Sequence, residues 1–317
     1  MWWLSDDPEA LWEQFGIKAD PALELSLELE HVWEALVGRS DGAWLARDEN
    51  GDDGRVVVHV ARAESSRYDV MKEGLDHHRP LPRLLACVSG SGSGFHGHRS
   101  RSWAAAPGNL HLSIMVRQQL YAGRVGVGLS MLPVVAVAGL LADMLPGEAR
   151  PGIKWVNDLI IDGRKVGGVL ASSQVRGVTI DECLFGIGLN VESTPEIEPS
   201  VFVPGATCLA EWMDEPPSLG FLVADFIERI EDLIQELSAV GPLKLHETYC
   251  RFAQGIGEEV FVWLDEPTDP LTRDPHAQGR LLAIRPDLSL EIADAPRPVN
   301  RGRLAFREDV EKFREKR

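Results

Sequence analysis

Residues 152–170, GIKWVNDLIIDGRKVGGVL, limit the possible folds more than any other segment of the chain. Two short apolar runs, 158–161 and 166–171, flank the dipeptide Asp162-Gly163. This dipeptide between apolar runs is the strongest short signal of a β-hairpin, because both central residues of the turn need a positive φ. The segment therefore predicts two adjacent antiparallel strands and, with them, a sheet.

Polar side chains converge on this predicted hairpin. Lys154, Asn157 and Asp158 come just before its first strand, and Lys165 follows the turn on the second strand. A few charged and amide groups beside an apolar sheet are typical of a ligand site. A solvated lysine after a hairpin turn is also common, so the spacing alone leaves both interpretations open.

Strands and helices are mixed along the rest of the chain, and the pattern changes after Gly255. Alternating and β-branched runs predict strands at 55–61, 109–116 and 183–191. Apolar spacing predicts helices at 8–15, 21–37, 130–145 and 218–238, the last two capped by Ser130 and Ser218. Four short strands separated by Pro- and Asp-rich loops follow, at 259–264, 279–285, 288–293 and 302–306. We expect an α/β fold with a mixed sheet, followed by a small antiparallel barrel.

The composition suggests four segments. Turn residues at 50–54 favour a boundary there, so we expect an N-terminal extension at 1–54 and a main domain at 55–250. The barrel would occupy 251–307, and 308–317 would form a charged tail that is helical or frayed.

Charge argues against a nucleic-acid partner. The net charge is −17 with a pI near 5.0, and the first 60 residues carry 14 acidic side chains against 4 basic ones. Such a field repels DNA, RNA and anionic membranes, so the extension is not expected to be a DNA-binding winged helix. The four cysteines are scattered singly, which indicates reduced core residues.

No membrane or export segment is expected either. The most apolar stretch, 129–141, has 13 residues before Asp143, whereas a membrane span needs roughly 20. Met1-Trp2-Trp3 is followed by Asp6 and Asp7 instead of lysines and an apolar run. We therefore expect a core helix at 129–141 and a cytoplasmic protein.

Four ordered blocks resemble those of the biotin protein ligases, within the biotin and lipoate ligase superfamily. Residues 152–170 are similar to the family's KWPNDL…DGRKLGGIL block and differ mainly at Val156, where the family usually has proline. SRSWAAAPGNLHLSI at 100–114 resembles GRxWxSPPGGNLYLSL, GIGLNV at 186–191 resembles GIGINV, and ATCL at 206–209 resembles ATSL. The resemblance extends over about residues 60–307 and implies an SH3-like barrel at the C-terminal end.

The chain departs from the family in one glycine-rich loop. Ligases carry GRGRRGR before the shared tryptophan, whereas this chain has SGSGSGFHGHRSR, residues 89–101, called the glycine loop below. Only Gly97, Arg99 and Arg101 fit the pattern, while His96 and His98 replace two arginines. In the family this loop orders over biotin and the phosphates. Its Ser and Gly residues still permit such ordering, but histidines are mostly neutral at pH 7, so less positive charge is expected.

Two further differences concern the acid-binding side. Arg67 replaces the asparagine of the family's D/E-S-T-N segment, and the glutamine that precedes the family's loop has no clear equivalent. A metal site built on His96 and His98 is a weaker alternative, because no third ligand is identifiable.

The resemblance implies specific roles for residues that match the family's motifs. The catalytic set is Lys165, Asp158 and Arg101. The set expected to bind nucleotide and biotin is Ser65, Ser66, Gly97, His98, Arg99, Trp103, Lys154, Trp155, Asn157, Gly167, Gly168, Gly188 and Asn190. In the family the lysine contacts both the carboxyl oxygen and the phosphate, and the aspartate lies near the acceptor lysine. No resident metal site is expected, and Mg²⁺ would accompany ATP.

The implied activity is ATP-dependent biotin ligation. The enzyme would form biotinyl-5'-AMP and pass biotin to a lysine of the biotin carboxyl carrier domain of a carboxylase, its expected partner; a homodimer is a further expectation. One alternative is a ligase for lipoate or octanoate, which the complete KWxNDL block and the terminal barrel disfavour. The other is a catalytically weak binding protein, which the altered loop favours and the intact Lys165 and Asp158 disfavour.

Overall fold

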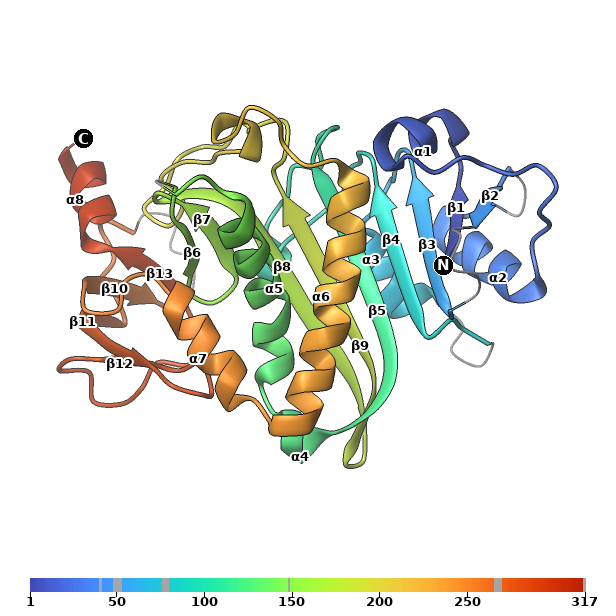
Figure 1. Ribbon diagram of the computed structural model, residues 1–317. Helices are drawn as coiled ribbons and strands as arrows, with labels where there is room; N and C mark the ends of the chain where they lie inside the picture. The colour runs from blue at the N-terminus through green and yellow to red at the C-terminus, as the bar shows by residue number, and fades with distance from the viewer. Residues whose placement is uncertain (40–41, 48–52, 76–79, 148, 265–269, 316–317) are drawn as a thin grey trace.

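A large mixed sheet organises the chain, as the computed structural model shows for residues 1–39, 42–47, 53–75, 80–147, 149–264 and 270–315 (Figure 1). Nine strands follow the order β2-β1-β3-β4-β5-β9-β8-β7-β6. Only the pairs β1–β3 and β3–β4 are parallel among these strands. Their bounds are β1 Trp2–Ser5, β2 Trp44–Arg47, β3 Arg55–Val60, β4 Leu84–Ser89, β5 Leu110–Tyr121, β6 Pro151–Lys154, β7 Asp158–Ile161, β8 Arg164–Arg176 and β9 Thr179–Leu189.

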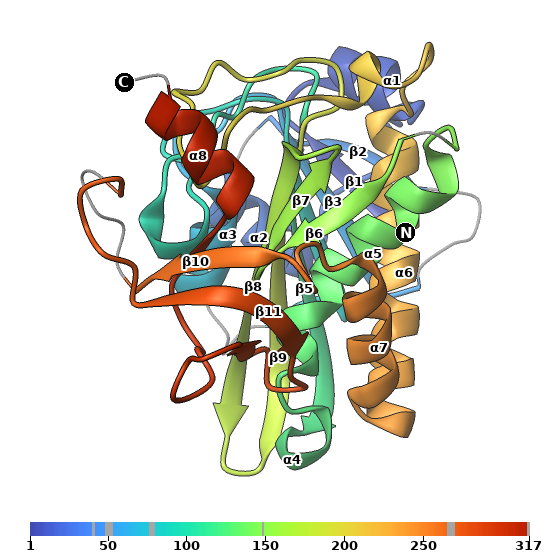
Figure 2. The ribbon, with the colours of Figure 1, turned by 90° about the vertical axis from the view of Figure 1, so that its left-hand side faces the viewer.

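Helices cover both faces of this sheet (Figures 1 and 2). On one face lie α5, Gly128–Met144, and α6, Leu219–Val240, whose apolar side chains pack with Val57 of β3. On the other face lies α2, Leu27–Val37, which packs against Val56 and Val58 of the same strand. Strands buried on both faces are apolar at successive positions, as β3 is. The remaining helices are α1 Pro8–Phe15, α3 Arg67–Asp69 with a π-turn at Val70–Gly74, α4 Ala122–Val125, α7 Leu243–Phe252 and α8 Arg307–Glu315.

A second, four-stranded antiparallel sheet follows α7 and is called the small sheet. Its order is β12-β11-β10-β13, with bounds β10 Glu259–Trp263, β11 Ala277–Ile284, β12 Leu290–Ile292 and β13 Arg303–Phe306. Trp155 anchors it to the main sheet by donating from Nε1 to the Leu288 carbonyl at 2.8 Å. The predicted α/β fold with a small antiparallel domain at the end is confirmed. Residues 308–315 of the predicted tail belong to α8.

The sheet continues across the boundary predicted near residue 54. β1 pairs in parallel with β3, and β2 pairs with β1 at the edge of the sheet. Trp33 and Leu36 of α2 are fully buried in a cluster that also contains Leu85 of β4. The N-terminal segment therefore shares a core with the main domain.

Two helix starts differ from the prediction. The helix expected at 21–37 begins at Leu27, because Ser26 caps it by accepting a hydrogen bond from the Leu29 amide at 3.3 Å. The helix expected to start at Ser130 begins at Gly128 without a side-chain cap. Gly128 packs against α6 so closely that an added Cβ would lie 2.5 Å from Leu237. Tertiary packing thus sets this start. Among the described residues, no helix combines the length and apolar composition of a membrane span.

Candidate active site

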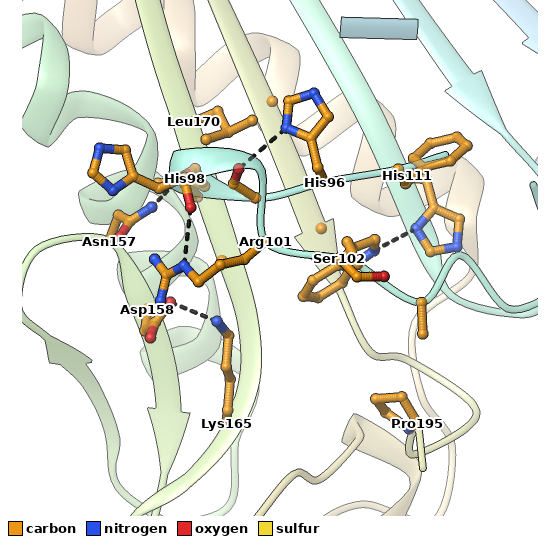
Figure 3. A pocket seen from close by; sticks show the side chains of 18 of the residues that line it. His96, His98, Arg101, Ser102, His111, Asn157, Asp158, Lys165, Leu170 and Pro195 are labelled. Carbon is orange, nitrogen blue, oxygen red and sulfur yellow. Dashed lines mark hydrogen bonds and ion pairs between the residues drawn. The ribbon is translucent and has the colours of Figure 1, made fainter. Parts of the chain in front are cut away.

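A cavity of about 330 Å³ lies over the central strands β5, β8 and β9. The glycine loop and the segment that follows β9 form its other walls (Figure 3). Gly186 and Gly188 form part of the floor; an added Cβ at Gly186 would lie 3.0 Å from Tyr68, and one at Gly188 would lie 2.6 Å from Trp103. The two glycines therefore leave room for aromatic rings directly above the sheet.

Lys165 and Asp158 form an ion pair at one end of this cavity. Lys165 Nζ lies 2.6 Å from Asp158 Oδ1, and Figure 3 shows Arg101 pointing toward the same carboxylate. Burial alone would raise the pKa of Asp158. The charges of Lys165 and Arg101 outweigh burial and hold that pKa below its usual value. The pair is thus a carboxylate and an ammonium, both facing the cavity.

The hairpin holds this pair in place. Its turn has positive φ at Asp162 and Gly163, as the dipeptide predicted, and β7 and β8 pair with a register shift beside Lys165. The backbone of Lys165 is fixed from its other side, since its amide donates to the Gly205 carbonyl and its carbonyl accepts from the Thr207 amide, both at 2.9 Å. Lys165 is therefore anchored between two segments that are distant in sequence.

The two histidines of the glycine loop have different surroundings. His96 donates from Nε2 to Asp69 at 2.6 Å and from Nδ1 to the Gly97 carbonyl at 3.1 Å. These two hydrogen bonds raise its pKa. In Figure 3 its ring points away from Asp158 and Lys165.

His98 lies beside the cationic end of the cavity instead. Its backbone carbonyl accepts a hydrogen bond from Arg101 Nε at 2.9 Å. Burial, followed by the charges of Arg101 and Arg99, lowers the pKa of His98. His98 is therefore a neutral base surrounded by fixed positive charge near neutral pH.

Trp103 and His111 form a hydrogen-bonded pair on the opposite side of the cavity. Trp103 Nε1 donates to His111 Nδ1 at 3.2 Å, and His111 Nε2 donates to the Ala106 carbonyl at 3.0 Å. Both ring nitrogens of His111 are thus occupied in one neutral tautomer, and burial lowers its pKa. The hydrogen bond holds the Trp103 ring, which lines the cavity.

Asn190 presents an acceptor with no partner. Its Nδ2 donates to the Thr207 carbonyl at 3.0 Å, while the buried Oδ1 atom has no hydrogen-bond partner within the described part of the chain. A buried polar atom of this kind is costly unless a ligand or water satisfies it. Asn109, by contrast, is structural, since its Oδ1 accepts from the three backbone amides of 191–193.

The structure brings most of the predicted site residues to this cavity. Those that line it are Ser66, Gly97, His98, Arg101, Trp103, Asn157, Asp158, Lys165, Gly168, Gly188 and Asn190.

Five predicted binding residues lie outside the main cavity, and each has another contact. Ser65 accepts from Arg67 at 2.7 Å, and Arg99 donates to the Leu264 carbonyl at 2.8 Å. Gly167 lies where an added Cβ would meet the Gly188 carbonyl at 2.6 Å. The other two, Lys154 and Trp155, line a smaller adjoining cavity.

Several lining residues were not predicted from the sequence. They share no local motif and come from distant segments: Tyr68, Phe95, Leu112, Ile187, Ile197, Glu198 and Arg303. For the strand residues, alternation in 109–116 indicates a buried face but not which residues contact a ligand. Arg303 is 138 positions from Lys165 (303 − 165), so only the tertiary fold brings it to the cavity.

The chain is similar in sequence to known ligases. The model of the biotin/lipoate A/B protein ligase family matches residues 61–190. A biotin--[acetyl-CoA-carboxylase] ligase of Paracoccus denitrificans is 32% identical over 112 residues, which cover 35% of this chain and 45% of that protein. The ligase of the same name from Mycobacterium tuberculosis is 30% identical over 202 residues, which cover 62% of this chain and 71% of that protein.

Solved structures agree on the fold. The biotin protein ligase of Aquifex aeolicus, in complex with biotin and ATP, superposes with a TM-score of 0.61 at 20% identity. The superposition covers 79% of this chain and 98% of that one. The Paracoccus match covers less than half of that ligase, whereas the mycobacterial match covers more than two thirds. On the strength of the mycobacterial match, this chain belongs to the biotin protein ligase family.

Proposed function

We propose that this protein activates biotin with ATP as biotinyl-5'-AMP and transfers the biotinyl group to a lysine of a carboxylase carrier domain. The observation that carries the proposal is the Lys165–Asp158 pair, 2.6 Å apart, at the polar end of a cavity otherwise lined largely by apolar and aromatic residues. Such a cavity suits an apolar acid whose carboxylate must meet a nucleotide phosphate. The relatives' names support biotin as the acid.

The first step joins two anions. A carboxylate oxygen of biotin attacks the α-phosphorus of ATP, the bond to the β-phosphate oxygen breaks, and pyrophosphate leaves. Lys165 and Arg101 would lower the barrier, because fixed cations stabilise the charge that develops between the reactants. Asn190 Oδ1 would accept a hydrogen bond from a nucleotide hydroxyl or amine, which would satisfy this buried atom.

The second step moves the acyl group. The amine of the carrier lysine attacks the acyl carbon, the bond from that carbon to the AMP oxygen breaks, and the amine nitrogen loses a proton. Asp158 has a lowered pKa, so it is a weak base. We therefore assign it mainly to holding the incoming ammonium and Lys165 in position, with the proton passing to AMP or solvent.

We propose that Mg²⁺ would enter this cavity with ATP and be held mostly by the phosphates. Within the described part of the chain, no three His, Cys, Asp or Glu side chains come together as a metal site. Asp158 and Glu198 are the carboxylates among the described residues that line the cavity. Mg²⁺ commonly binds one or two carboxylates plus substrate phosphates, and it would neutralise phosphate charge here.

Mass spectrometry of the products tests the proposal. We expect purified protein with ATP and biotin to accumulate biotinyl-AMP, and Lys165→Ala to lower its rate of formation by at least about a hundredfold, the effect of removing one fixed charge from a reacting centre. Lys244→Ala is the matched control, because that exposed lysine pairs with Glu236 on the surface. Adenylate formation by Lys165→Ala at nearly the wild-type rate would refute the assignment.

A second variant separates the two steps. Asp158→Asn should slow transfer from preformed biotinyl-AMP to a carrier domain at least as much as it slows adenylation, because it removes the carboxylate that faces Lys165. Single-turnover transfer assays measure this directly. Equal transfer rates for Asp158→Asn and wild type would exclude the positioning role.

A further inference from the structure

Trp212 and Thr207 lie behind the wall of the main cavity, and neither is among the described residues that line it. Trp212 Nε1 donates a hydrogen bond to Thr207 Oγ1 at 2.8 Å. Thr207 is fully buried, and the half-buried indole of Trp212 packs against the main hydrophobic cluster. Any effect of Trp212 on a bound molecule must therefore pass through the residues that Thr207 contacts.

Thr207 contacts two residues of the candidate active site through its backbone. Its amide donates to the Lys165 carbonyl at 2.9 Å, and its carbonyl accepts a hydrogen bond from Asn190 Nδ2 at 3.0 Å. A carbonyl can only accept, so this hydrogen bond determines which atom of the Asn190 amide is the nitrogen. The other atom, Oδ1, is the buried acceptor without a partner in the described part of the chain. Thr207 thus sets the orientation of the Asn190 side chain.

The backbone of Asn190 is held by other contacts. Its amide donates to the Val166 carbonyl at 2.8 Å, and its carbonyl accepts from the Leu209 amide at 3.1 Å. These two hydrogen bonds join Asn190 to β8 and to the short helical turn Leu209–Glu211 that precedes Trp212. A change in the side chain of Trp212 or Thr207 should therefore alter the orientation of the Asn190 amide more than the position of its backbone.

An ion pair and a ring contact hold the indole in place. The guanidinium carbon of Arg164 lies 5.0 Å from the centre of the Trp212 ring, and Arg164 Nη1 lies 2.6 Å from Glu211 Oε2. Thr194 Oγ1 donates to the other oxygen of Glu211. The hydrogen bond from Thr194, followed by those from Arg164 and Thr207, outweighs burial and lowers the pKa of Glu211. Glu211 is therefore charged at neutral pH and keeps Arg164 over the indole.

We propose that Trp212 is a positioning residue for the nucleotide, because through Thr207 it keeps Asn190 Oδ1 available to the adenosine part of ATP. This inference rests on the proposed function. Without the indole N–H, the buried Thr207 hydroxyl loses its donor, and a buried polar group without its partner is costly. Thr207 then shifts to find another donor, and its carbonyl no longer holds Asn190 Nδ2 in one place.

Steady-state kinetics of adenylate formation test this role. Trp212→Phe should raise the KM for ATP about fivefold, as expected for one hydrogen bond, and leave kcat and the KM for biotin nearly unchanged. Thr207→Val should have the same effect, whereas Thr207→Ser keeps the hydroxyl and should behave like wild type. Trp12→Phe is the matched control, because that ring is 58% exposed on α1. An equal KM for ATP in Trp212→Phe and wild type would overturn the inference.

A double-mutant cycle with Asn190→Ala distinguishes positioning from a merely structural role. If Trp212 acts through Asn190, adding Trp212→Phe to Asn190→Ala should raise the KM for ATP no further. The same fold increase in both backgrounds would show that Trp212 acts on the fold in general and would refute its positioning role.

Titration with ATP, followed by calorimetry, repeats the comparison without turnover. Weaker ATP binding by Trp212→Phe, in a protein that makes no adenylate, would support the positioning role while refuting the proposed function. Adenylate formation with an ATP affinity that does not depend on Trp212 would do the reverse. No binding of ATP to the wild-type protein would overturn the inference.

Discussion

His96 and His98 lie two residues apart in the glycine loop, yet their surroundings shift their pKa values in opposite directions. Hydrogen bonds to the Gly97 carbonyl and Asp69 raise the pKa of His96, whereas burial and two neighbouring arginines lower that of His98. The sequence predicts only that both replace arginines. Their different roles depend on Asp69, which is 27 positions earlier and reaches His96 only in the folded chain.

Of the two loop histidines, we expect His98 and not His96 to make nucleotide binding depend on pH. Phosphates near its ring would raise its bound-state pKa above the lowered free-state pKa, so binding takes up a proton. Affinity is then highest at low pH and falls as pH rises through the bound-state pKa. Adenylate should therefore dissociate several-fold faster at pH 8 than at pH 6. Asp158 also favours protonated His98, while Arg99 and Arg101 oppose it.

Dissociation rates of biotinyl-AMP at the two pH values provide the measurement. His98→Ala should lose the pH dependence, and His96→Ala, the matched control in the same loop, should keep it. If His96→Ala abolishes the dependence and His98→Ala does not, the assignment of the two rings is reversed.

The buried charge of Lys154 lowers the stability of the folded protein. It is 5% exposed and its pKa is about 8, so its charge is held in the core at a cost. The unfolded chain, where lysine titrates near 10.4, binds more protons between these two values, so stability rises with pH across that window. Lys154→Met should therefore stabilise the protein by about 1–3 kcal/mol below pH 8, and by less above it.

Urea unfolding of Lys154→Met and wild type at pH 7 and pH 9.5 checks this expectation. Lys18→Met is the control, since that side chain is exposed and should change stability little at either pH. A destabilised Lys154→Met at pH 7 would mean that the hydrogen bond to Phe202 and the contact with the Phe306 ring outweigh the cost of burying the charge.

At the scale of elements, Arg67 joins α2 to the predicted acid-binding loop. The buried side chain donates from Nη1 to the Leu36 carbonyl in the last turn of α2. It also donates from Nη2 to Ser65 Oγ at 2.7 Å and from Nε to the Ser65 carbonyl at 3.1 Å. The last turn of α2 contains no basic residue of its own, so Arg67 satisfies and neutralises that helix end. Ser66, next to it, lines the cavity.

Arg67→Ala should therefore affect binding and stability together. Three hydrogen bonds disappear and buried acceptors are left unpaired, which should cost about 1–3 kcal/mol of stability and raise the KM for biotin more than it lowers kcat. Arg67→Lys should restore part of the stability because it can still reach the Leu36 carbonyl. Arg62→Ala, near the same loop, is the control. An unchanged KM for biotin would show that the hydrogen bonds of Arg67 have no effect on the site.

Element prediction succeeded where local signals were strong. The helix expected at 218–238 is α6, capped by Ser218 and periodic throughout, and the hairpin dipeptide lies between β7 and β8. β4, sequence LLACVS, was missed because it is buried on both faces and shows no alternation. β1 and β2 were missed because four-residue strands depend on pairing with distant partners.

At the scale of the whole molecule, some residues of the cavity can be predicted from a local motif and others cannot. Lys165, Asp158 and Asn157 lie within one hairpin, so a local motif was enough to predict that they converge. Arg303 and Tyr68 reach the cavity only because the small sheet and α3 pack at its two ends. Long-range packing of this kind leaves no periodic signal along the chain, so sequence reasoning could not supply it.

The shared core also determines how the N-terminal segment should behave. β1 pairs with β3 along Trp2–Ser5, Arg55 pairs with Glu231 of α6 at 2.6 Å, and Trp33 is fully buried beneath β3 and β4. We expect one cooperative unfolding transition for the full chain, because the described buried residues of the N-terminal segment share their hydrophobic clusters with the main domain. An appended domain would instead unfold separately.

Trp33→Ala tests this coupling without deleting a strand. Loss of a fully buried indole should lower the free energy of unfolding by about 3–5 kcal/mol. If the chain unfolds as one cooperative unit, slowly exchanging amides throughout the chain, including those of β5, should exchange faster. Trp12→Ala, in which the removed ring is 58% exposed, should leave those amides nearly unchanged. Hydrogen exchange followed by mass spectrometry distinguishes the alternatives, since faster exchange confined to residues 1–54 would show that the N-terminal segment opens on its own. Faster exchange in β5 as well would make this acidic segment part of the catalytic fold, because β5 carries His111 on the cavity wall.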